Sequence, residues 1–263
     1  MNKAIRRKIR EWLYRRGFTI VPNPMAQFLG WEKTRRQREA HDVISGERHQ
    51  PFYSQLGQDY LASALFGGSG YFVEFGACDG LKHSNTKALE ELGWKGILAE
   101  PDKSWHEALE QNRPGAIIST QCVWKESGAT LNFSSATIGV LSTLSEFQTS
   151  DFHLRKIRES YPVETISLLD LLREQGAPDY IHYLSIDTEG SEFDILASFD
   201  FDAYRFGLIT VEHNFTDMRE KLHTLLTGHG YVRALEVHSR WDDWYFDPAL
   251  IERHGIEPLS ALL

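Results

Sequence analysis

The stretch Phe72-Val73-Glu74-Phe75-Gly76-Ala77-Cys78-Asp79-Gly80 joins an apolar run to a loop that begins and ends with glycine. The apolar part is typical of a buried parallel strand, and the glycines predict a tight turn after it. Short branched and aromatic runs then recur between helical stretches, as in an α/β fold around a mostly parallel sheet. The loop lacks the full G-x-G-x-x-G spacing, and its acidic residues disfavour a phosphate ligand.

The same pattern predicts the order of elements along the rest of the chain. Further strands are expected at residues 96–100, 116–119, 183–187 and 208–213. Helices are expected from Ser84 to Gly93, after Pro101, at 165–175 opening at Ser167, up to Phe199, and at 217–226. Residues 129–134 are read as an excursion from the third strand. Two closing strands, near 231–237 and 244–246, are expected to pair as an antiparallel hairpin.

Charge divides the chain into a basic leader and an acidic body. Residues 1–50 hold 12 basic and 5 acidic residues, whereas residues 51–263 hold 16 and 32. The acidic body disfavours nucleic-acid binding, which depends on Lys and Arg at phosphates. Within residues 1–20, Ile5, Ile9, Trp12 and Leu13 form the apolar stripe of a basic amphipathic helix. We expect this helix to contact a membrane surface or a protein partner, the alternative being that it packs on the main domain.

Other features of composition limit the class of protein. No apolar window is long enough for a membrane span and no secretion signal is evident, so a cytoplasmic protein is expected, with peripheral attachment at the inner membrane surface through the leader as an alternative. Cys78 and Cys122 belong to no paired thiol motif and are expected to be free thiols.

Acidic residues gather where the predicted strands end. In open α/β sheets the ligand lies outside the carboxyl ends of the strands, which here carry Glu74, Glu100, Asp187 and Glu212. An acidic loop suits a ligand that carries an ammonium group and a positive sulfur. Glu100 is placed to accept hydrogen bonds from both hydroxyls of a ribose, which NAD and S-adenosylmethionine share. Glu100 alone does not distinguish between these two cofactors.

Several motifs, taken together, resemble those of the FkbM-type S-adenosylmethionine-dependent methyltransferases over residues 53–247. They are the stretch 72–80, Ser84-Asn85-Thr86, Gly93-Trp94, residues 96–101 and Ser185-Ile186-Asp187-Thr188-Glu189-Gly190-Ser191-Glu192. The resemblance implies a class I methyltransferase fold, Rossmann-like, with seven strands and an antiparallel last strand. It also implies hydroxyl acceptors on sugars, glycans or glycosylated and polyketide-type metabolites. The methyltransferase domain is therefore expected at residues 51–263.

On this reading S-adenosylmethionine is the expected cofactor. Glu74 is expected to face the methionine ammonium, Gly76 and Gly80 to let the backbone approach the ligand, and Glu100 to hold the ribose. The full set of cofactor residues predicted is Glu74, Gly76, Asp79, Gly80, Ser84, Asn85, Glu100 and Asp102. For Asp79 the alternative is a helix cap, as it is for Ser84 and Asn85, and Asp102 is also expected to cap the helix after Pro101.

The acceptor side is predicted from the ends of the fourth and fifth strands. His213 is the first choice for a base, with Asp187 and Glu189 as further catalytic residues. Asp187, Glu212 and His213 are alternatively ligands for a divalent metal such as Mg²⁺ that would acidify a bound hydroxyl. The competing interpretations are that His213 is a hydrogen-bonded structural residue and that Glu189 caps the helix after Gly190.

A polar and aromatic cluster near the C-terminus suits a sugar ring. Trp241, Asp242 and Asp243 are the predicted substrate residues, because aromatic faces stack on C–H groups while carboxylates accept from hydroxyls. Core packing is the alternative for the tryptophans. Two other functions stay open at this point: a nicotinamide-dependent oxidoreductase, and a non-catalytic interaction module that retains the fold.

Overall fold

The computed structural model describes residues 52–151 and 153–256. The predicted leader helix at residues 1–20, and the boundary at residue 50, lie outside these ranges. Within them, no helix combines the length and the apolar composition needed to cross a membrane.

The main sheet has seven strands in the order β10-β11-β9-β8-β1-β2-β3. Its parallel strands are β1 (Tyr71–Phe75), β2 (Lys95–Ala99), β3 (Ile117–Ser119), β8 (Tyr180–Ile186) and β9 (Arg205–Glu212). β11 (Asp242–Phe246) runs antiparallel to both β9 and β10 (Val232–Arg233). The predicted seven-stranded, mostly parallel α/β sheet with an antiparallel last strand is therefore confirmed, and it is the class I methyltransferase arrangement.

The closing hairpin differs from the prediction in one detail. β10 and β11 do pair, but residues 236–239, partly assigned to the first closing strand, form the short helix α9 (Glu236–Ser239). β11 then enters the sheet between β10 and β9, with Asp242 opposite Glu212. This pairing matters for the site, because it brings the start of β11 to the carboxyl end of β9.

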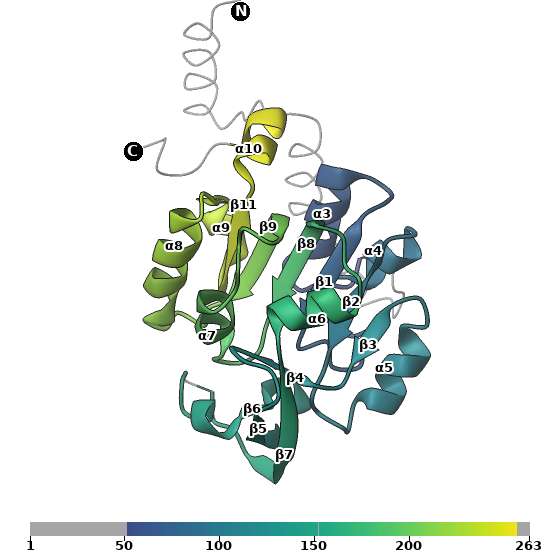
Figure 1. The fold of residues 1–263 in the computed structure, drawn as a ribbon, viewed down its shortest axis with the longest axis vertical. Helices are drawn as coiled ribbons and strands as arrows, with labels where there is room; N and C mark the ends of the chain where they lie inside the picture. Colours follow the sequence, from purple (N-terminus) through teal and green to yellow (C-terminus); the bar gives the residue numbers. More distant parts are fainter. Residues whose placement is uncertain (1–51, 152, 257–263) are drawn as a thin grey trace, which may run out of the picture.

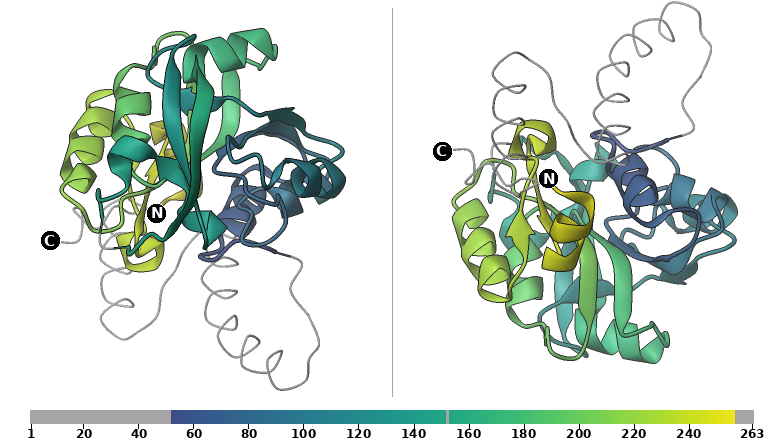
Figure 2. Two further views of the ribbon diagram at one scale, coloured as in Figure 1. Left: turned by 90° about the horizontal axis from the view of Figure 1, so that it is seen from below. Right: turned by 90° about the horizontal axis from the view of Figure 1, so that it is seen from above.

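Helices cover both faces of the main sheet (Figures 1 and 2). On one face, α6 (Leu168–Glu174), α7 (Glu192–Ala197) and α8 (Met218–Gly228) contribute buried leucines and isoleucines to a core that includes Val73 and Phe75. On the other face, α3 (Gln58–Phe66), α4 (Lys87–Glu91), α5 (His106–Asn112) and α10 (Pro248–His254) contribute to a core that includes Phe72 and Leu98. Adjacent residues of β1 therefore feed opposite cores, as strand geometry requires.

A second sheet, in the order β4-β7-β5-β6, interrupts the alternating pattern between β3 and α6. Its strands are β4 (Cys122–Trp124), β5 (Thr130–Ala136), β6 (Thr143–Leu144) and β7 (Ile157–Ser167). Figure 1 shows this sheet beyond one end of the main sheet, and the view from below in Figure 2 places it in front. The sequence indicated only an excursion at residues 129–134, so the size of this insertion is a correction.

The helix predicted at residues 165–175 begins later than expected. Thr165 and Ile166 belong to β7, where they pair with Cys122 and Val123 of β4. α6 then starts at Leu168, and the Ser167 hydroxyl accepts a hydrogen bond from the Asp170 N–H at 3.1 Å. The predicted opening at Ser167 is therefore confirmed, and pairing with β4 explains why the residues before it are extended.

Candidate functional site

A cavity of about 370 Å³ lies at the carboxyl ends of the parallel strands, within the usual range for small-molecule sites. It adjoins β1 and β8, between which the strand order reverses, the place where open α/β sheets bind ligands. Its lining includes six carboxylic acids from five strands or the loops after them: Glu74, Glu100, Asp187, Glu189, Glu212 and Asp242. A cavity with this lining favours a ligand that carries positive charge.

Unusual backbone conformations gather at this cavity. Of the seven non-glycine residues with positive φ in the described ranges, five line it: Cys78, His83, Glu189, Asn214 and Phe215. Each such conformation costs free energy and persists only where the surrounding structure enforces it, which is frequent at ligand sites. The loops after β1, β8 and β9 are thus held in shapes that the sheet alone does not require.

Gly76 marks the junction between the loop after β1 and the end of β8. Its φ is 73°, and a Cβ added there would lie inside contact distance of the backbone oxygen of Asp187. Both facts demand glycine. The backbone at Gly76 was predicted to approach the ligand closely. In the structure Gly76 lies against the protein's own backbone, and it also lines the cavity.

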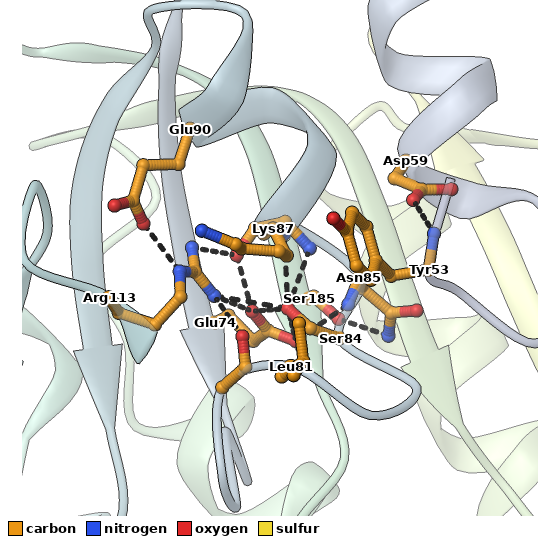
Figure 3. A network of polar contacts seen from close by, with 12 residues as sticks. Tyr53, Asp59, Glu74, Leu81, Ser84, Asn85, Lys87, Glu90, Arg113 and Ser185 are labelled. Atoms are coloured by element: carbon orange, nitrogen blue, oxygen red, sulfur yellow. Dashed lines mark hydrogen bonds and ion pairs between the residues drawn. The ribbon is translucent and has the colours of Figure 1, made fainter. Parts of the chain in front are cut away.

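Glu74 is the centre of a buried network (Figure 3). Its carboxylate accepts hydrogen bonds from the Asn85 N–H at 2.8 Å, the Ser84 hydroxyl at 3.1 Å and the Thr86 hydroxyl, and it lies 3.6 Å from a guanidinium nitrogen of Arg113. Glu74, Ser84 and Asn85 all line the cavity, and their contact with a cofactor stays a prediction. The structure, however, gives the Glu74 carboxylate protein partners that also anchor the loop.

Glu100 follows β2 and lies beside the same loop. One carboxylate oxygen accepts from the Cys78 N–H at 2.8 Å and the other from the Asp102 N–H at 2.7 Å. Burial raises the pKa of Glu100 to about 7 against the opposing effect of these two hydrogen bonds. Each oxygen retains a lone pair, so Glu100 is able to accept hydrogen bonds from a ligand in the cavity that it lines.

Three predicted cofactor residues do not line the cavity. Asp79 accepts from the Leu81 and Lys82 N–H groups at 2.9 and 2.8 Å and so caps a turn, whereas the alternative predicted for it was a helix cap and the next helix, α4, begins only at Lys87. Gly80 packs against Arg113 and Leu109. Asp102 is buried and accepts from the hydroxyls of residues 104, 135 and 142, which ties the main sheet to the insertion. Their predicted contact with the cofactor is therefore corrected to a supporting role.

Asp187, Glu189 and Glu212 meet at the ends of β8 and β9, with one oxygen of each within 4.8 Å of the others. Asp187 and Glu212 interact directly, and two buried carboxyl groups that lie so close are able to share one proton. Burial and the charge of Glu192 raise the pKa of Asp187 to about 7, and burial raises that of Glu212 as well. Such a pair is able to take up or release a proton near neutral pH.

Glu189 is held differently from its neighbours. Its carboxylate lies 2.7 Å from a guanidinium nitrogen of Arg155, which also binds both oxygens of Asp151. Burial raises the pKa of Glu189, and Arg155 opposes that rise. Asp151, His153 and Glu189 lie close enough for a metal, but the Arg155 guanidinium already joins two of them.

His213 does not belong to the cluster in which it was predicted. Side chains alternate along a strand, so Glu212 faces the cavity while His213 faces the opposite side, 3.7 Å from Asp243. Burial lowers the pKa of His213. The predicted metal ligands Asp187, Glu212 and His213 are consequently not brought together, and the structure does not support His213 as the base.

The predicted substrate residues divide in the same way. Trp241 and Asp242 line the cavity, and the Gln58 amide donates to Asp242 at 2.9 Å. Burial raises the pKa of Asp242 to about 7. Asp243 points away and accepts from Arg219 and Arg233, so its assignment to the substrate site is corrected.

Arg113 and Arg155 are the residues that sequence reasoning missed. Their side chains are 0% and 1% exposed, and each holds a carboxylate of the cavity through partners 30 or more residues away in the chain. No local spacing signals such contacts. A hint was available, however, because an unpaired buried carboxylate is costly and Glu74 and Glu189 each needed a cation.

Comparison with solved structures found distant likenesses. A precorrin-6y C5,15-methyltransferase from Geobacter metallireducens has 9% sequence identity and a TM-score of 0.37, and the match covers 70% of this chain and 85% of that one. A TehB-like SAM-dependent methyltransferase from Corynebacterium glutamicum has 8% identity and a TM-score of 0.41, with 83% of this chain and 98% of that one covered. A fibrillarin/Nop5p complex has 14% identity and a TM-score of 0.36, with 74% of this chain and 80% of that one covered. These distant likenesses carry no argument about function. No curated protein matches the sequence.

A family model gives a clearer result. The methyltransferase FkbM domain matches residues 74–243, which is more than half of the chain and includes every cavity-lining residue except Gln55 and Gln58. The strand order and the position of the cavity fit that match. The chain belongs to the FkbM methyltransferase family.

Proposed function

We propose that this protein transfers a methyl group from S-adenosylmethionine to a hydroxyl group of an uncharged, sugar-like acceptor. The observation that carries the proposal is the lining of one cavity by six carboxylic acids, five at the carboxyl ends of parallel strands and one, Asp242, at the start of β11. S-adenosylmethionine supplies an electrophilic methyl group on a positively charged sulfur. A cavity of about 370 Å³ with a surplus of acids suits such a cation.

On the β1–β2 side, the residues fit the donor. Glu100 has lone pairs free for ribose hydroxyls, and Asn85 is held at the cavity wall by hydrogen bonds from its backbone N–H to Glu74 and from its amide to Ser185. Both contacts fix the loop before any ligand arrives. A loop held in this way lowers the cost of ordering on binding.

On the other side, the Asp187 and Glu212 pair is the proposed proton acceptor. A sugar hydroxyl has a pKa far above 7, so its attack on a methyl carbon gains from removal of its proton as the bond forms. The new bond joins the acceptor oxygen to the methyl carbon, the sulfur–carbon bond breaks, and the proton passes to a carboxylate oxygen of the pair. A pKa near 7 at Asp187 suits that transfer.

The lining also favours a class of acceptor. Trp241 and Phe215 offer aromatic surface, and Phe215 is 64% exposed, while Gln58 and Asn214 offer amides. Aromatic faces and amides suit a sugar ring, whereas a phosphate or carboxylate on the acceptor would be repelled by Asp187, Glu212 and Asp242. We therefore propose an acceptor without negative charge.

Calorimetry with three ligands tests the donor. S-adenosylmethionine is expected to bind more tightly than S-adenosylhomocysteine, which lacks the positive sulfur, and NAD is expected not to bind because of its pyrophosphate. Binding of NAD in preference to S-adenosylmethionine would contradict the proposal and favour the oxidoreductase.

Methyl transfer from labelled S-adenosylmethionine to a panel of glycosides, each paired with its phosphate ester, tests the acceptor. Turnover of the neutral member of a pair is the expected result. Donor binding without turnover on any acceptor would favour an interaction module. Repeating the assay with a chelator tests for a divalent metal at Asp187, Glu189 and Glu212, since turnover by the carboxylate pair alone survives chelation.

A further inference from the structure

Arg113, the residue after α5, is fully buried although it carries a charge. Its guanidinium donates to the Gly80 carbonyl at 3.3 Å, the Ser84 hydroxyl at 3.1 Å and the Thr86 hydroxyl at 2.9 Å (Figure 3). It also forms an ion pair with Glu90, on α4. Arg113 thus contacts the loop after β1 at Gly80 and again at Ser84 and Thr86.

The loop is shaped around this side chain. Gly80 has a φ of 69°, and a Cβ there would lie 2.5 Å from Cγ of Arg113 and 2.6 Å from Cδ1 of Leu109. Next to Arg113, the Asn112 amide donates to the Asp79 carbonyl at 2.8 Å. The end of α5 therefore fixes the backbone of residues 79 and 80, which lie between the two cavity-lining parts of the loop, residues 76–78 and 82–85.

A short chain of contacts leads from Arg113 to the cavity. Ser84 and Thr86 accept from Arg113 and donate to Glu74, and Glu74 accepts from the backbone N–H of Asn85. The Asn85 amide in turn donates to Ser185 on β8 at 2.9 Å. Arg113 itself is not among the cavity-lining residues.

We propose that Arg113 is a positioning residue, which sets the affinity for S-adenosylmethionine by holding Glu74 and the Ser84-Asn85-Thr86 segment in place. The proposal rests on the proposed function, because it takes S-adenosylmethionine as the ligand of this cavity. Arginine is needed because its planar fork reaches several acceptors at once, which the single ammonium of lysine does not do.

Calorimetric titration of the full chain with S-adenosylmethionine tests this role. Arg113→Lys retains the charge and is expected to weaken binding about tenfold, which corresponds to ~1.4 kcal/mol. Thr86→Val removes the hydroxyl between Arg113 and Glu74 without changing a charge, and it is expected to weaken binding in the same direction. It also serves as the test if Arg113→Lys does not fold. Arg205→Lys is the matched control, because Arg205 pairs with Asp247 at the start of β9, the end of that strand opposite the cavity.

Non-additivity separates positioning from general stability. If Arg113 acts through Glu74, the double variant of Arg113→Lys with Glu74→Gln binds no more weakly than the worse single variant. A purely structural role would lower the thermal midpoint of Arg113→Lys yet leave the affinity of the folded protein within about twofold of wild type, and this result would overturn the proposal. Additive losses in the double variant would also overturn it. Failure of the wild-type protein to bind S-adenosylmethionine would instead refute the proposed function.

Discussion

On the β1–β2 side of the cavity, Glu74 and Glu100 accept hydrogen bonds from backbone N–H groups, and Glu74 has Arg113 beside it. On the β8–β9–β11 side, Asp187 lies beside another acid, Glu212. The first side has its negative charge partnered by fixed donors. Burial raises a pKa to about 7 on both sides, at Glu100 and at Asp187, but on the second side Asp187 and Glu212 also face each other.

This difference suggests a division of labour between the two sides. Carboxylates that accept hydrogen bonds from the backbone hold a loop in shape, and their remaining lone pairs bind a ligand without reorganising. Carboxyl groups that share a proton are poised to exchange it. The predictions below change one side and leave the other side as its reference.

The largest effect is expected for Asp187→Asn. This change removes one member of the proposed proton-accepting pair, so the turnover of a hydroxyl acceptor should fall by about 10²–10⁴. The affinity for S-adenosylmethionine, measured by calorimetry, should change far less, because Glu74 and Glu100 on the other side are untouched. Equal losses in both quantities would show that the two sides do not divide the work.

His213→Gln is the control for that experiment. His213 lies close in sequence to Glu212 but faces Asp243 on the opposite side of β9, so the folded variant should retain wild-type turnover. A loss of turnover as large as that of Asp187→Asn would return His213 to the role predicted from the sequence.

Gly76→Ala tests the junction at which the two sides touch. Because the added methyl would meet the backbone oxygen of Asp187 and φ is 73°, we expect the free energy of unfolding to fall by about 3 kcal/mol. Gly128→Ala is the control, since Gly128 has a φ of 77° but nothing within 4 Å of an added Cβ. Its loss should be only ~1 kcal/mol, the cost of the left-handed backbone. Equal losses in denaturant titrations would mean that the close approach has no energetic importance.

The main sheet and the place of the cavity could be predicted from the sequence. The strands of the main sheet were readable because each is a short apolar run, and the cavity followed because parallel strands end at one edge. β7 was harder to recognise, since its first residues alternate between exposed and half-buried positions and include Pro162. Only pairing with β5 and β4 makes that segment a strand.

The sequence also did not predict on which side of a strand each side chain projects. Whether Glu212 or His213 faces the cavity depends on the register of β9 against β11, which pairs Glu212 with Asp242. A shift of one residue would exchange the two side chains, and their sequence alone does not determine that register. Arg113 and Arg155 were unpredictable for a related reason, because their partners come from distant parts of the chain.

Glu100→Gln is expected to have an intermediate effect. It removes a charge and one acceptor oxygen on the β1–β2 side, so the affinity for S-adenosylmethionine should fall by about 10- to 100-fold, the range for hydrogen bonds to a charged group. Glu107→Gln, an exposed acid on α5, is the control and should leave the affinity unchanged. Unchanged affinity in Glu100→Gln, measured by calorimetry on folded protein, would contradict the assignment of the ribose site.

The smallest effect concerns stability and pH. The pKa of Asp187 rises from 3.8 to about 7 on folding, so the folded protein retains a proton that the unfolded chain has lost, and the free energy of unfolding falls as the pH rises through that interval. Asp187→Asn removes this penalty, and its thermal midpoint should exceed that of wild type by about 2–4 °C near pH 8 but not near pH 5.

Asp151→Asn should behave oppositely, because Arg155 and its hydrogen bonds lower the pKa of Asp151 and favour the ionised form. That variant should be less stable than wild type at both pH values, since its contribution is lost only as the pH falls through the lowered pKa. Calorimetric melting curves of the three proteins check the sign of each change in midpoint. A midpoint for Asp187→Asn that stays below that of wild type near pH 8 would contradict the prediction. It would show that the proton shared with Glu212 stabilises the fold more than the buried charge destabilises it.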